Sequence, residues 1–568
     1  MATLSLPRDA TLWDVWRRHA DTRPDAEAIV HWSALGTPHR WTWSGVLARA
    51  AHFASALYAM GIERDHVCAL VVRHHPDFYP LYMAVESLGA IPAVLAYPNP
   101  RLHPDKFRQG LSGMAKRSGL DWLLTEPALE PIVRPLAEEP GTTLRGILFP
   151  LEAPAASGVL PAPTHVQVDS DAPCLLQHSS GTTGLQKPVM LSHRAVLSHL
   201  ENYGRAIALS PEDKIVSWLP LYHDMGLIAA FHLPLAFGLT AVHIDPFEWV
   251  GYPALFLQAV SAERGTLGWM PNFAFNVLAD RVNEDDLEDV RLDSLRMLIN
   301  CSEPVRADSH ARFRERYAPL GFRAESLASC YAMAETTFAI CQSAPGTAPK
   351  VFRASRAGLA AGKADPAAEG EEARDCVSSG ILVPSCDLRV TTTAGEDLPD
   401  GEVGELLVRS ESLFSGYRNN PVATQSVLVD GWYHTGDLGF RDGDEHYVIG
   451  RKKDILIVAG KNIYPEDVED AVSGVAGILP GRVIACGVDD SSMGTEQIWV
   501  IAETAQPAGE HASLEVAVAR AGMAIDVSIS RVVLVEPRWL IKSSAGKPSR
   551  RANIERLADL VSSQQKGP

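Results

Sequence analysis

The sequence predicts an α/β protein with parallel sheets and several subdomains. Short apolar runs alternate with helical patterns, and the runs are too continuous for strands that expose one face to water. After Gly380 the pattern changes to short strands and tight turns, which indicates a small β-rich subdomain. The 568 residues, of which 46% are hydrophobic, are enough for large cores in more than one domain.

The first hundred residues establish the alternation. Residues 12–19 carry apolar side chains at helical spacing, and Ser44 is placed to cap a second helix that ends at Gly61. An apolar strand, a helix and another strand follow at residues 67–72, 79–88 and 91–95. This order predicts a parallel strand pair with its connecting helix on one face of the sheet.

The same alternation recurs in the middle of the chain, with strands expected at residues 265–269, 296–301 and 326–330. The longest apolar stretch, residues 226–242, contains Pro234 and Gly238 and is shorter than the ~20 residues of a membrane-spanning helix. We expect it to form a buried helix and a strand, and we expect no membrane span. Residues 345–373 are rich in Ala, Gly, Pro and charge, and are predicted to form a surface insertion or long loop.

The chain is expected to divide near a charged link at residues 450–454. Residues 1–450 would form the N-terminal core, with the β-rich subdomain at about 380–450. Residues 451–568 would form a C-terminal domain, since a block of this size is typical of a small domain.

Composition excludes some classes of function. The net charge of −18 disfavours a nucleic-acid-binding surface. The eight cysteines form no Cys-x-x-Cys pairs, so neither a zinc site nor a disulfide framework is predicted, and a reducing compartment fits them. The first residues lack a basic segment followed by an apolar block, so a cytoplasmic location without a signal peptide is expected.

A loop rich in hydroxyls and glycine lies between two apolar segments at residues 174–177 and 189–193. Such a loop lets backbone amides and hydroxyls gather around phosphate oxygens, and Lys187 adds a positive charge at its end. No Gly-Lys-Ser/Thr sequence occurs in the chain, so it is not a Walker A loop. The alternative is a flexible Ser/Gly turn. The loop comprises Ser179, Ser180, Gly181, Thr182, Thr183, Gly184, Leu185, Gln186 and Lys187.

Six segments in order resemble the motifs of the adenylate-forming superfamily, which includes acyl-CoA synthetases, fatty acyl-AMP ligases, amino-acid-adenylating domains and luciferases. They are SSGTTGLQK at 179–187, LPLYHDMG at 219–226, YAMAET at 331–336, YHTGD at 433–437, GRKKD at 450–454 and KSSAGK at 542–547. The resemblance runs nearly end to end. It implies stacked α/β sheets in the N-terminal region and a mobile C-terminal lid.

The resemblance also implies the reaction. A carboxylate attacks the α-phosphate of ATP with Mg²⁺ present, acyl-AMP forms and pyrophosphate leaves. A thiol then displaces AMP, and that thiol belongs to CoA or to the phosphopantetheine of an acyl carrier protein. Two anions must approach each other in the first step, so cations and oriented amides are needed at the phosphorus.

By resemblance, the loop from Ser179 to Gly184 and Lys187 hold the outer phosphates, and Glu335 binds Mg²⁺. The resemblance implies further nucleotide-binding positions. Tyr331 is expected against the adenine face, with Asp437 and Arg451 at the ribose. The full set of these remaining positions is Ser302, Glu303, Tyr331, Ala332, Asp437 and Arg451.

Lys547 matches the catalytic lysine of the terminal motif, with Lys542 as the nearest alternative. Lys453 matches the hinge about which the lid turns. His223 matches a side chain that orients the substrate carboxylate, although packing in the core is an equal alternative for it. The acyl pocket is expected to include Trp269, Met270 and Phe273.

The fatty acyl-AMP ligase branch is the nearest likeness, and residues 349–376 lie where that branch carries an insertion thought to hinder the pose needed for CoA. Two features differ from that branch: many of its members lack the loop lysine, which is present here as Lys187, and Gly460-Lys461-Asn462 resembles the region that lines the pantetheine tunnel of CoA ligases. The thiol acceptor therefore stays open between CoA and a carrier protein. The acid is expected to be fatty or bulky and hydrophobic, and a carrier protein or transferase is an expected partner. Alternatives are a CoA ligase for a bulky natural-product acid, a luciferase-type monooxygenase and a non-catalytic acyl-nucleotide binder. Asp224 leaves open an amino acid as substrate.

Overall fold

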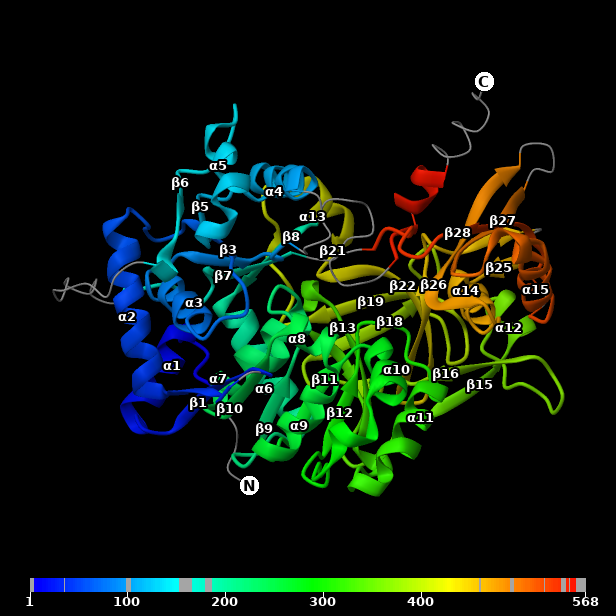
Figure 1. Cartoon of the computed structure of the whole chain (residues 1–568), viewed down its shortest axis with the longest axis horizontal. Coiled ribbons are helices and arrows are strands. Elements are labelled where there is room, and N and C mark those ends of the chain that lie inside the picture. Colours follow the sequence, from blue (N-terminus) through cyan, green and yellow to red (C-terminus); the bar gives the residue numbers. More distant parts are fainter. Residues whose placement is uncertain are drawn as a thin grey trace.

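The computed structural model of the chain describes residues 5–34, 36–98, 104–152, 166–178, 186–458, 461–490, 495–525, 527–542, 548–550 and 552–557. Figure 1 shows the arrangement of their helices and strands. The N-terminal elements form the left and lower parts of this view, and the C-terminal strands and helices lie at the right.

The largest sheet of the described residues has nine strands in the order β17-β14-β13-β12-β11-β9-β10-β1-β2. Its central strands from β13 to β1 run parallel, and β14, β17 and β2 pair antiparallel at the edges. In that order the strands are Ile381–Leu382, Ala339–Gln342, Leu327–Ala332, Met297–Asn300, Leu267–Met270, Lys214–Ser217, Thr240–Ile244, Glu27–Trp32 and His39–Thr42. The prediction of parallel strands in the middle of the chain is confirmed.

A second sheet is parallel throughout. Successive side chains of its β3 strand point to opposite faces, so Val67 and Val71 join one hydrophobic cluster while Cys68 and Leu70 join another. Because both faces are packed, the strand has no polar alternation in its sequence. The order is β4-β3-β5-β6, at Ile91–Val94, Val67–Val71, Trp122–Thr125 and Gly146–Leu148.

Most helices lie in the N-terminal region. The prediction that Ser44 caps the second helix is wrong, because the side chain of Thr42 accepts the capping hydrogen bond from the Gly45 amide. Both residues carry a hydroxyl, but β2 ends at Thr42 and the helix begins at the next residue. These helices are α1 Leu12–Thr22, α2 Trp43–Ala59, α3 Phe78–Ser87, α4 Pro104–Ser118, α5 Glu130–Glu138, α6 His193–Ala206, α8 Pro246–Gly251, α9 Ala254–Glu263, α10 Asn272–Arg281 and α11 Ala307–Tyr317.

The long apolar stretch forms a helix and a strand, as predicted. It begins as a π-helix, η3 (Met225–His232), continues as α7 (Leu233–Phe237) and ends at Gly238, whose φ of +66° suits glycine. A Cβ on Gly226 would lie 2.4 Å from the Pro220 carbonyl oxygen, so only glycine fits there. Among the described residues, no helix is both long enough and apolar enough to cross a membrane.

The segment predicted as a surface insertion or long loop contains regular structure, which corrects the loop alternative. Strands β15 (Val351–Ser355) and β16 (Ala373–Val377) pair antiparallel over five residue pairs, with α12 (Arg356–Ala360) after the first strand. Phe352 packs edge-on against Phe440 at 5.3 Å between ring centroids. The many small and charged residues weakened the alternating pattern that would have revealed these strands.

After Gly380 the described residues form mostly short strands. The main sheet of this region runs β18-β19-β22-β21, with β23 paired to β22. A smaller sheet, β20-β8-β7, connects this region to the strands that flank the predicted phosphate loop. The bounds are β18 Cys386–Thr391, β19 Gly404–Ser410, β21 Leu428–Val429, β22 Trp432–Asp442, β23 Glu445–Arg451, β20 Gly416–Tyr417, β8 Pro188–Ser192, β7 Pro173–His178 and helix α13 Pro421–Val427.

The C-terminal block has a hydrophobic cluster of its own, which includes Val468, Val500 and Val518. Its strands follow the order β26-β27-β28, and a short hairpin, β24-β25, precedes them. The elements are β24 Leu456–Val458, β25 Lys461–Ile463, α14 Pro465–Ser473, β26 Ile478–Asp490, β27 Thr495–Thr504, α15 His511–Met523 and β28 Ile529–Val535. In Figure 1 the β15–α12–β16 segment lies beneath this block at the right.

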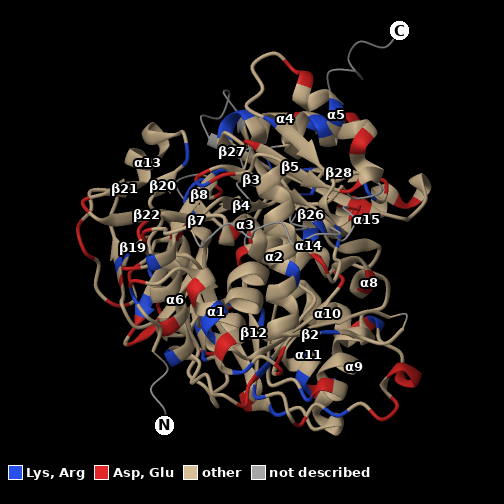
Figure 2. Cartoon of the chain, turned by 90° about the vertical axis from the view of Figure 1, so that its left-hand side faces the viewer, with Lys and Arg blue, Asp and Glu red and all other residues tan. Residues whose placement is uncertain are grey.

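Charged residues of both signs are interspersed over the outer elements in Figure 2, whereas the central strands β3, β4 and β7 are largely uncharged. All eight cysteines are free and buried.

A cluster of histidines packs around Tyr79 near the ends of β1 and β10. The Tyr79 hydroxyl oxygen lies 3.3 Å from His31 Nδ1 and 3.3 Å from His74 Nε2, and the His31 and His74 rings are 4.4 Å apart. His243 is fully buried beside them. Burial and the neighbouring histidines lower the pKa of His31 to about 2, and those of His74 and His243 to about 3.

These histidines make the protein acid-sensitive. In the unfolded chain they bind protons near pH 6.5, whereas in the folded protein they stay neutral. Each of them therefore lowers the free energy of unfolding as the pH falls below about 6.5. We expect His243→Gln to reduce the drop in thermal unfolding midpoint between pH 7.5 and pH 5.5 relative to the unmodified chain. An equal or larger drop in the variant would contradict this assignment. His52→Gln, on the outward part of α2, is the matched control.

Candidate active site

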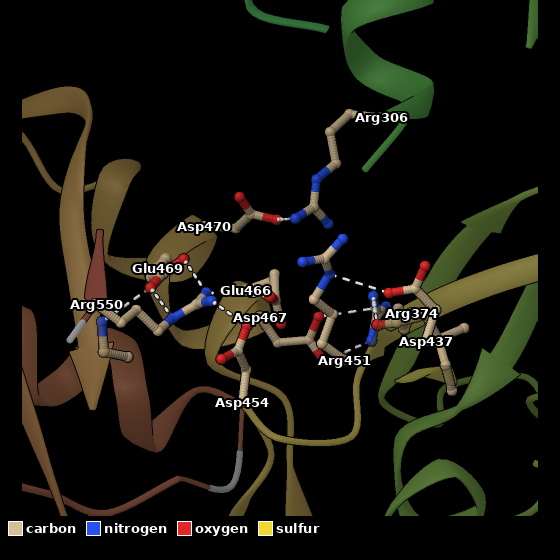
Figure 3. Close-up of polar contacts among 12 residues, drawn as sticks. Arg306, Arg374, Asp437, Arg451, Asp454, Glu466, Asp467, Glu469, Asp470 and Arg550 are labelled. Atoms are coloured by element: carbon tan, nitrogen blue, oxygen red, sulfur yellow. Dashed lines mark hydrogen bonds and ion pairs between the residues drawn. The ribbon is translucent and has the colours of Figure 1, made fainter. Parts of the chain in front are cut away.

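Asp437 lies where the core and the β-rich region meet. It is on β22, opposite Arg451 at the end of β23, and it contacts Tyr331 on β13. One Asp437 oxygen accepts a hydrogen bond of 2.7 Å from the Tyr331 hydroxyl, and the other is 3.0 Å from Arg451 Nε. The Asp437 side chain is 6% exposed and that of Arg451 48%. Figure 3 shows the pair at the edge of the C-terminal block.

Local structure fixes the direction of this carboxylate. Gly436 has a φ of +70°, a conformation that suits glycine, and the Thr435 hydroxyl accepts a 3.0 Å hydrogen bond from the Asp437 amide. Asp437 raises the pKa of the Arg451 guanidinium, and Glu335 is among the more distant carboxylates that act in the same direction. Glu335 is therefore within electrostatic reach of the Asp437–Arg451 pair.

Glu335 and Lys187 come together at one aromatic side chain. Glu335 is on a 3₁₀ turn, η7 (Ala334–Thr336), and is 8% exposed. The Tyr417 hydroxyl donates a 2.8 Å hydrogen bond to Glu335 Oε1. Lys187 Nζ is 3.5 Å from the same hydroxyl oxygen and 4.6 Å from the centroid of the Tyr417 ring.

The turn that carries Glu335 is strained. Thr337 has a φ of +67° and a ψ of −53°, which is rare for a β-branched residue. Two hydrogen bonds of 2.8 Å hold it in place: the Thr337 hydroxyl donates to the Ser412 carbonyl, and the Phe414 amide donates to the Glu335 carbonyl. The segment that ends in Tyr417 thus braces the turn from one side.

His223 lies in the loop between β9 and η3. Its ring is 4.7 Å from the Tyr222 ring, and its carbonyl accepts a hydrogen bond from Leu227. Gln177, on the strand that leads to the predicted phosphate loop, donates a 2.9 Å hydrogen bond to the Tyr222 carbonyl. His223 is therefore held near the start of that loop.

Ser302 and Glu303 follow β12. Ser302 adopts a left-handed conformation with φ of +69°, and its hydroxyl is 3.9 Å from the Met225 sulfur. Glu303 accepts a 2.9 Å hydrogen bond from the Phe273 amide. Ala332 is half-buried directly after Tyr331.

The three residues predicted for the acyl pocket occupy different surroundings. Trp269 and Met270 are fully buried on β11, and the Trp269 indole donates a 2.8 Å hydrogen bond to the Tyr203 hydroxyl. Phe273 is 39% exposed on α10, beside two tryptophan rings that stack at 3.6 Å. Those rings belong to Trp218 and Trp249.

Two lysines of the C-terminal block are among the sequence-predicted candidates. Burial, followed by the positive charge of Arg451, lowers the pKa of Lys453. Lys542 donates a 3.3 Å hydrogen bond to the Gly481 carbonyl, and burial followed by Arg482 lowers its pKa to about 8. Lys547 and the loop from Ser179 to Gly184 lie outside the described residues.

Helix α14 is held by arginines from both sides (Figure 3). Asp467 pairs with Arg374 of β16 at 3.2 Å and with Arg356 of α12 at 3.3 Å, and Asp470 pairs with Arg306. On the opposite side, Arg550 contacts Asp454, Glu466 and Glu469 at 2.9–3.1 Å. The segment predicted as an insertion thus binds the C-terminal block directly.

The residues present fit a magnesium ion with few protein ligands. In the part of the chain that the structure describes, no three His, Cys, Asp or Glu side chains are placed to hold a metal ion. Mg²⁺ bound beside nucleotide phosphates needs only one or two carboxylates and takes its other ligands from phosphate and water. The buried carboxylate of Glu335 is a suitable ligand of this kind.

Known proteins that resemble this chain identify its family. The family model for AMP-binding enzymes matches residues 16–418, and the chain belongs to this family.

Similar proteins span almost the whole chain. A long-chain-fatty-acid–AMP ligase, FadD26, of Mycobacterium marinum is 28% identical over 96% of this chain and 97% of its own length. A putative acyl-CoA synthetase of Caulobacter vibrioides is 30% identical over 88% of this chain and 87% of its own. A structure from a study of fatty acyl-adenylate ligases of E. coli and L. pneumophila has a TM-score of 0.89 at 26% identity, covering 97% of this chain and 98% of that one.

Sequence reasoning missed Tyr417, Thr337 and the arginines that hold α14. Tyr417 belongs to a strand of two residues, too short for any periodicity. The arginine contacts join residues that are distant in sequence, so no local pattern announces them. For Thr337, nothing in its residue type indicates a positive φ.

The Arg374–Asp467 pair is expected to stabilise the contact between β16 and α14. Arg374 is 7% exposed and Asp467 11%, so Asp467→Asn leaves a buried guanidinium with weakened pairing. The loss should be about 3 kcal/mol, seen as a lower midpoint of urea unfolding. Asp387→Asn breaks the exposed pair with Arg409 and should cost less than about 1 kcal/mol. Equal effects of the two variants would contradict the assignment.

Proposed function

We propose that this enzyme uses Mg·ATP to convert a hydrophobic carboxylic acid into acyl-AMP and then passes the acyl group to a thiol. The observation that carries the proposal is a pair of clusters, Tyr331–Asp437–Arg451 and Glu335–Tyr417–Lys187, which are joined because Tyr331 lies on β13 and Glu335 on the turn directly after it. The first suits a nucleoside, because a buried carboxylate can accept hydrogen bonds from ribose hydroxyls. The second suits phosphates and their metal.

Each residue has a defined part in the proposed reaction. The substrate carboxylate oxygen forms a bond to the α-phosphorus, the bond to pyrophosphate breaks, and pyrophosphate leaves. Lys187 and the loop Ser179, Ser180, Gly181, Thr182, Thr183 and Gly184 hold the outer phosphates. Asp437 and Arg451 hold the ribose, and Tyr331, Ala332, Ser302 and Glu303 surround the base and the α-phosphate. His223 orients the incoming carboxylate.

A bound Mg²⁺ would neutralise charge on the phosphates, and Glu335 is the residue we assign to hold it. Lys547 is assigned as the cation that bridges the substrate carboxylate and the α-phosphate. Residues 451–568 form the lid on the core of residues 1–450, and Lys453 is the hinge that lets Lys547 enter and leave.

The names of the relatives support a fatty or otherwise hydrophobic acid as substrate. We assign Trp269, Met270 and Phe273 to the acyl pocket, where the Trp269 indole would be held rigidly by its hydrogen bond to Tyr203. The free, buried cysteines suit a reducing compartment such as the cytoplasm.

For the acceptor we favour the phosphopantetheine thiol of a carrier protein, because Arg356 and Arg374 of the insertion hold α14 against the core. CoA is the second candidate, supported by the relative named as a putative acyl-CoA synthetase. Thioester formation with phosphopantetheinylated carrier protein but not with CoA is the expected result. Rapid formation of acyl-CoA would reverse the order of the two candidates.

Acid-dependent exchange of pyrophosphate into ATP tests the proposal directly. We expect exchange with hydrophobic acids, and we expect Lys547→Ala to slow it by about 10²–10³-fold, the cost of losing one charge-stabilising donor. Lys542→Ala removes the nearest lysine of the same segment and should change the rate far less. Absence of exchange with every acid of a broad panel, or full activity of Lys547→Ala, would refute the proposal.

A further inference from the structure

We propose that Tyr417 is a positioning residue that orients the Glu335 carboxylate and the Lys187 ammonium while holding them apart. This inference rests on the proposed function. It adds a residue that lies in none of the six motifs and contacts both charged groups.

The backbone brings Tyr417 to this position. Strand β20 pairs with β8, where Tyr417 faces Val189, and the Arg418 amide donates a 2.9 Å hydrogen bond to the Pro188 carbonyl. The end of the phosphate loop is therefore fixed to β20. Three residues earlier, Phe414 donates its amide to the Glu335 carbonyl. The short segment from Phe414 to Arg418 thus hydrogen-bonds both to the start of β8, next to Lys187, and to the turn that carries Glu335.

The Tyr417 hydroxyl gives the two charged groups different contacts. It has one hydrogen, which it donates to Glu335 Oε1, and its oxygen accepts from Lys187. The ring adds a cation–π contact to the ammonium.

This arrangement has a chemical purpose. A lysine and a glutamate in direct contact would neutralise each other, and both would be lost to the nucleotide. With the phenol between them, the contact engages Oε1 and leaves Oε2 to face a metal, while the ammonium can turn to a phosphate. Partners of a metal-binding carboxylate orient it and tune its affinity for the metal.

Binding of α,β-methylene ATP, which cannot be cleaved at the α-phosphate, separates these effects. Isothermal calorimetry is done on the full chain with Mg²⁺ and with EDTA. Tyr417→Phe should weaken binding about ten-fold with Mg²⁺, the weight of one hydrogen bond to a charged group, and change it little with EDTA. Tyr417→Leu also removes the ring, and should weaken binding a further few-fold under both conditions.

Tyr447→Phe is the matched control. It removes the hydroxyl of another buried tyrosine of the β-rich region, packed on Phe440 at 4.6 Å and away from the site, and should bind as the unmodified chain does. The Mg²⁺ concentration for half-maximal pyrophosphate exchange should rise for Tyr417→Phe, while the KM for the acid stays constant.

Two results would overturn the inference: unchanged Mg²⁺-dependent binding in Tyr417→Phe, or an equal loss with Mg²⁺ and EDTA accompanied by a lower unfolding temperature. The second result would show a purely structural role. If the unmodified chain binds the nucleotide but shows no acid-dependent exchange, the proposed function fails, whereas the Mg²⁺-dependent difference between the variants still decides the role of Tyr417.

Discussion

The site depends on one buried carboxylate, Asp437, held between a neutral donor and a cation. Tyr331 comes from the nine-stranded sheet, and Asp437 and Arg451 come from neighbouring strands of the β-rich region. The contact therefore joins two sheets at the point where the chain passes to its C-terminal block. A buried carboxylate needs such partners, because an unpaired charge there would be costly. Because Tyr331 and Arg451 hold the Asp437 carboxylate in a fixed direction, it can also accept hydrogen bonds from a polar ligand.

A second constraint is the separation of opposite charges. Lys187 and Glu335 both contact the Tyr417 hydroxyl, and the positive charges of Arg451 and Lys187 both act to lower the pKa of Lys453. Several cations thus converge on a region with two buried carboxylates. Such an arrangement suits a polyanion with a metal ion, because added negative charge relieves the repulsion among the cations. The arginines that hold α14 fix the C-terminal block beside this region.

Much of the fold could be predicted from the sequence, because buried parallel strands read as apolar runs and the helices between them keep their spacing. The runs at residues 67–72 and 296–301 illustrate this. The strands in and next to residues 345–373 could not be predicted, since their apolar and polar residues do not alternate strongly. For the site, Glu335, Asp437 and Arg451 followed from motif resemblance. Tyr417 and the Arg374–Asp467 pair could not be predicted from the sequence, because they depend on contacts between distant segments that no local pattern records.

The most direct test compares ATP with 2′-deoxy-ATP and 3′-deoxy-ATP, for the unmodified chain and for Asp437→Asn. If Asp437 binds the ribose, removal of a hydroxyl should weaken nucleotide binding by the unmodified chain, and the same removal should matter much less in the variant. Such non-additivity identifies a direct contact between the two groups. If removal of a ribose hydroxyl weakened nucleotide binding equally in both proteins, the two effects would be additive, and this result would contradict the central role given to the Asp437 carboxylate.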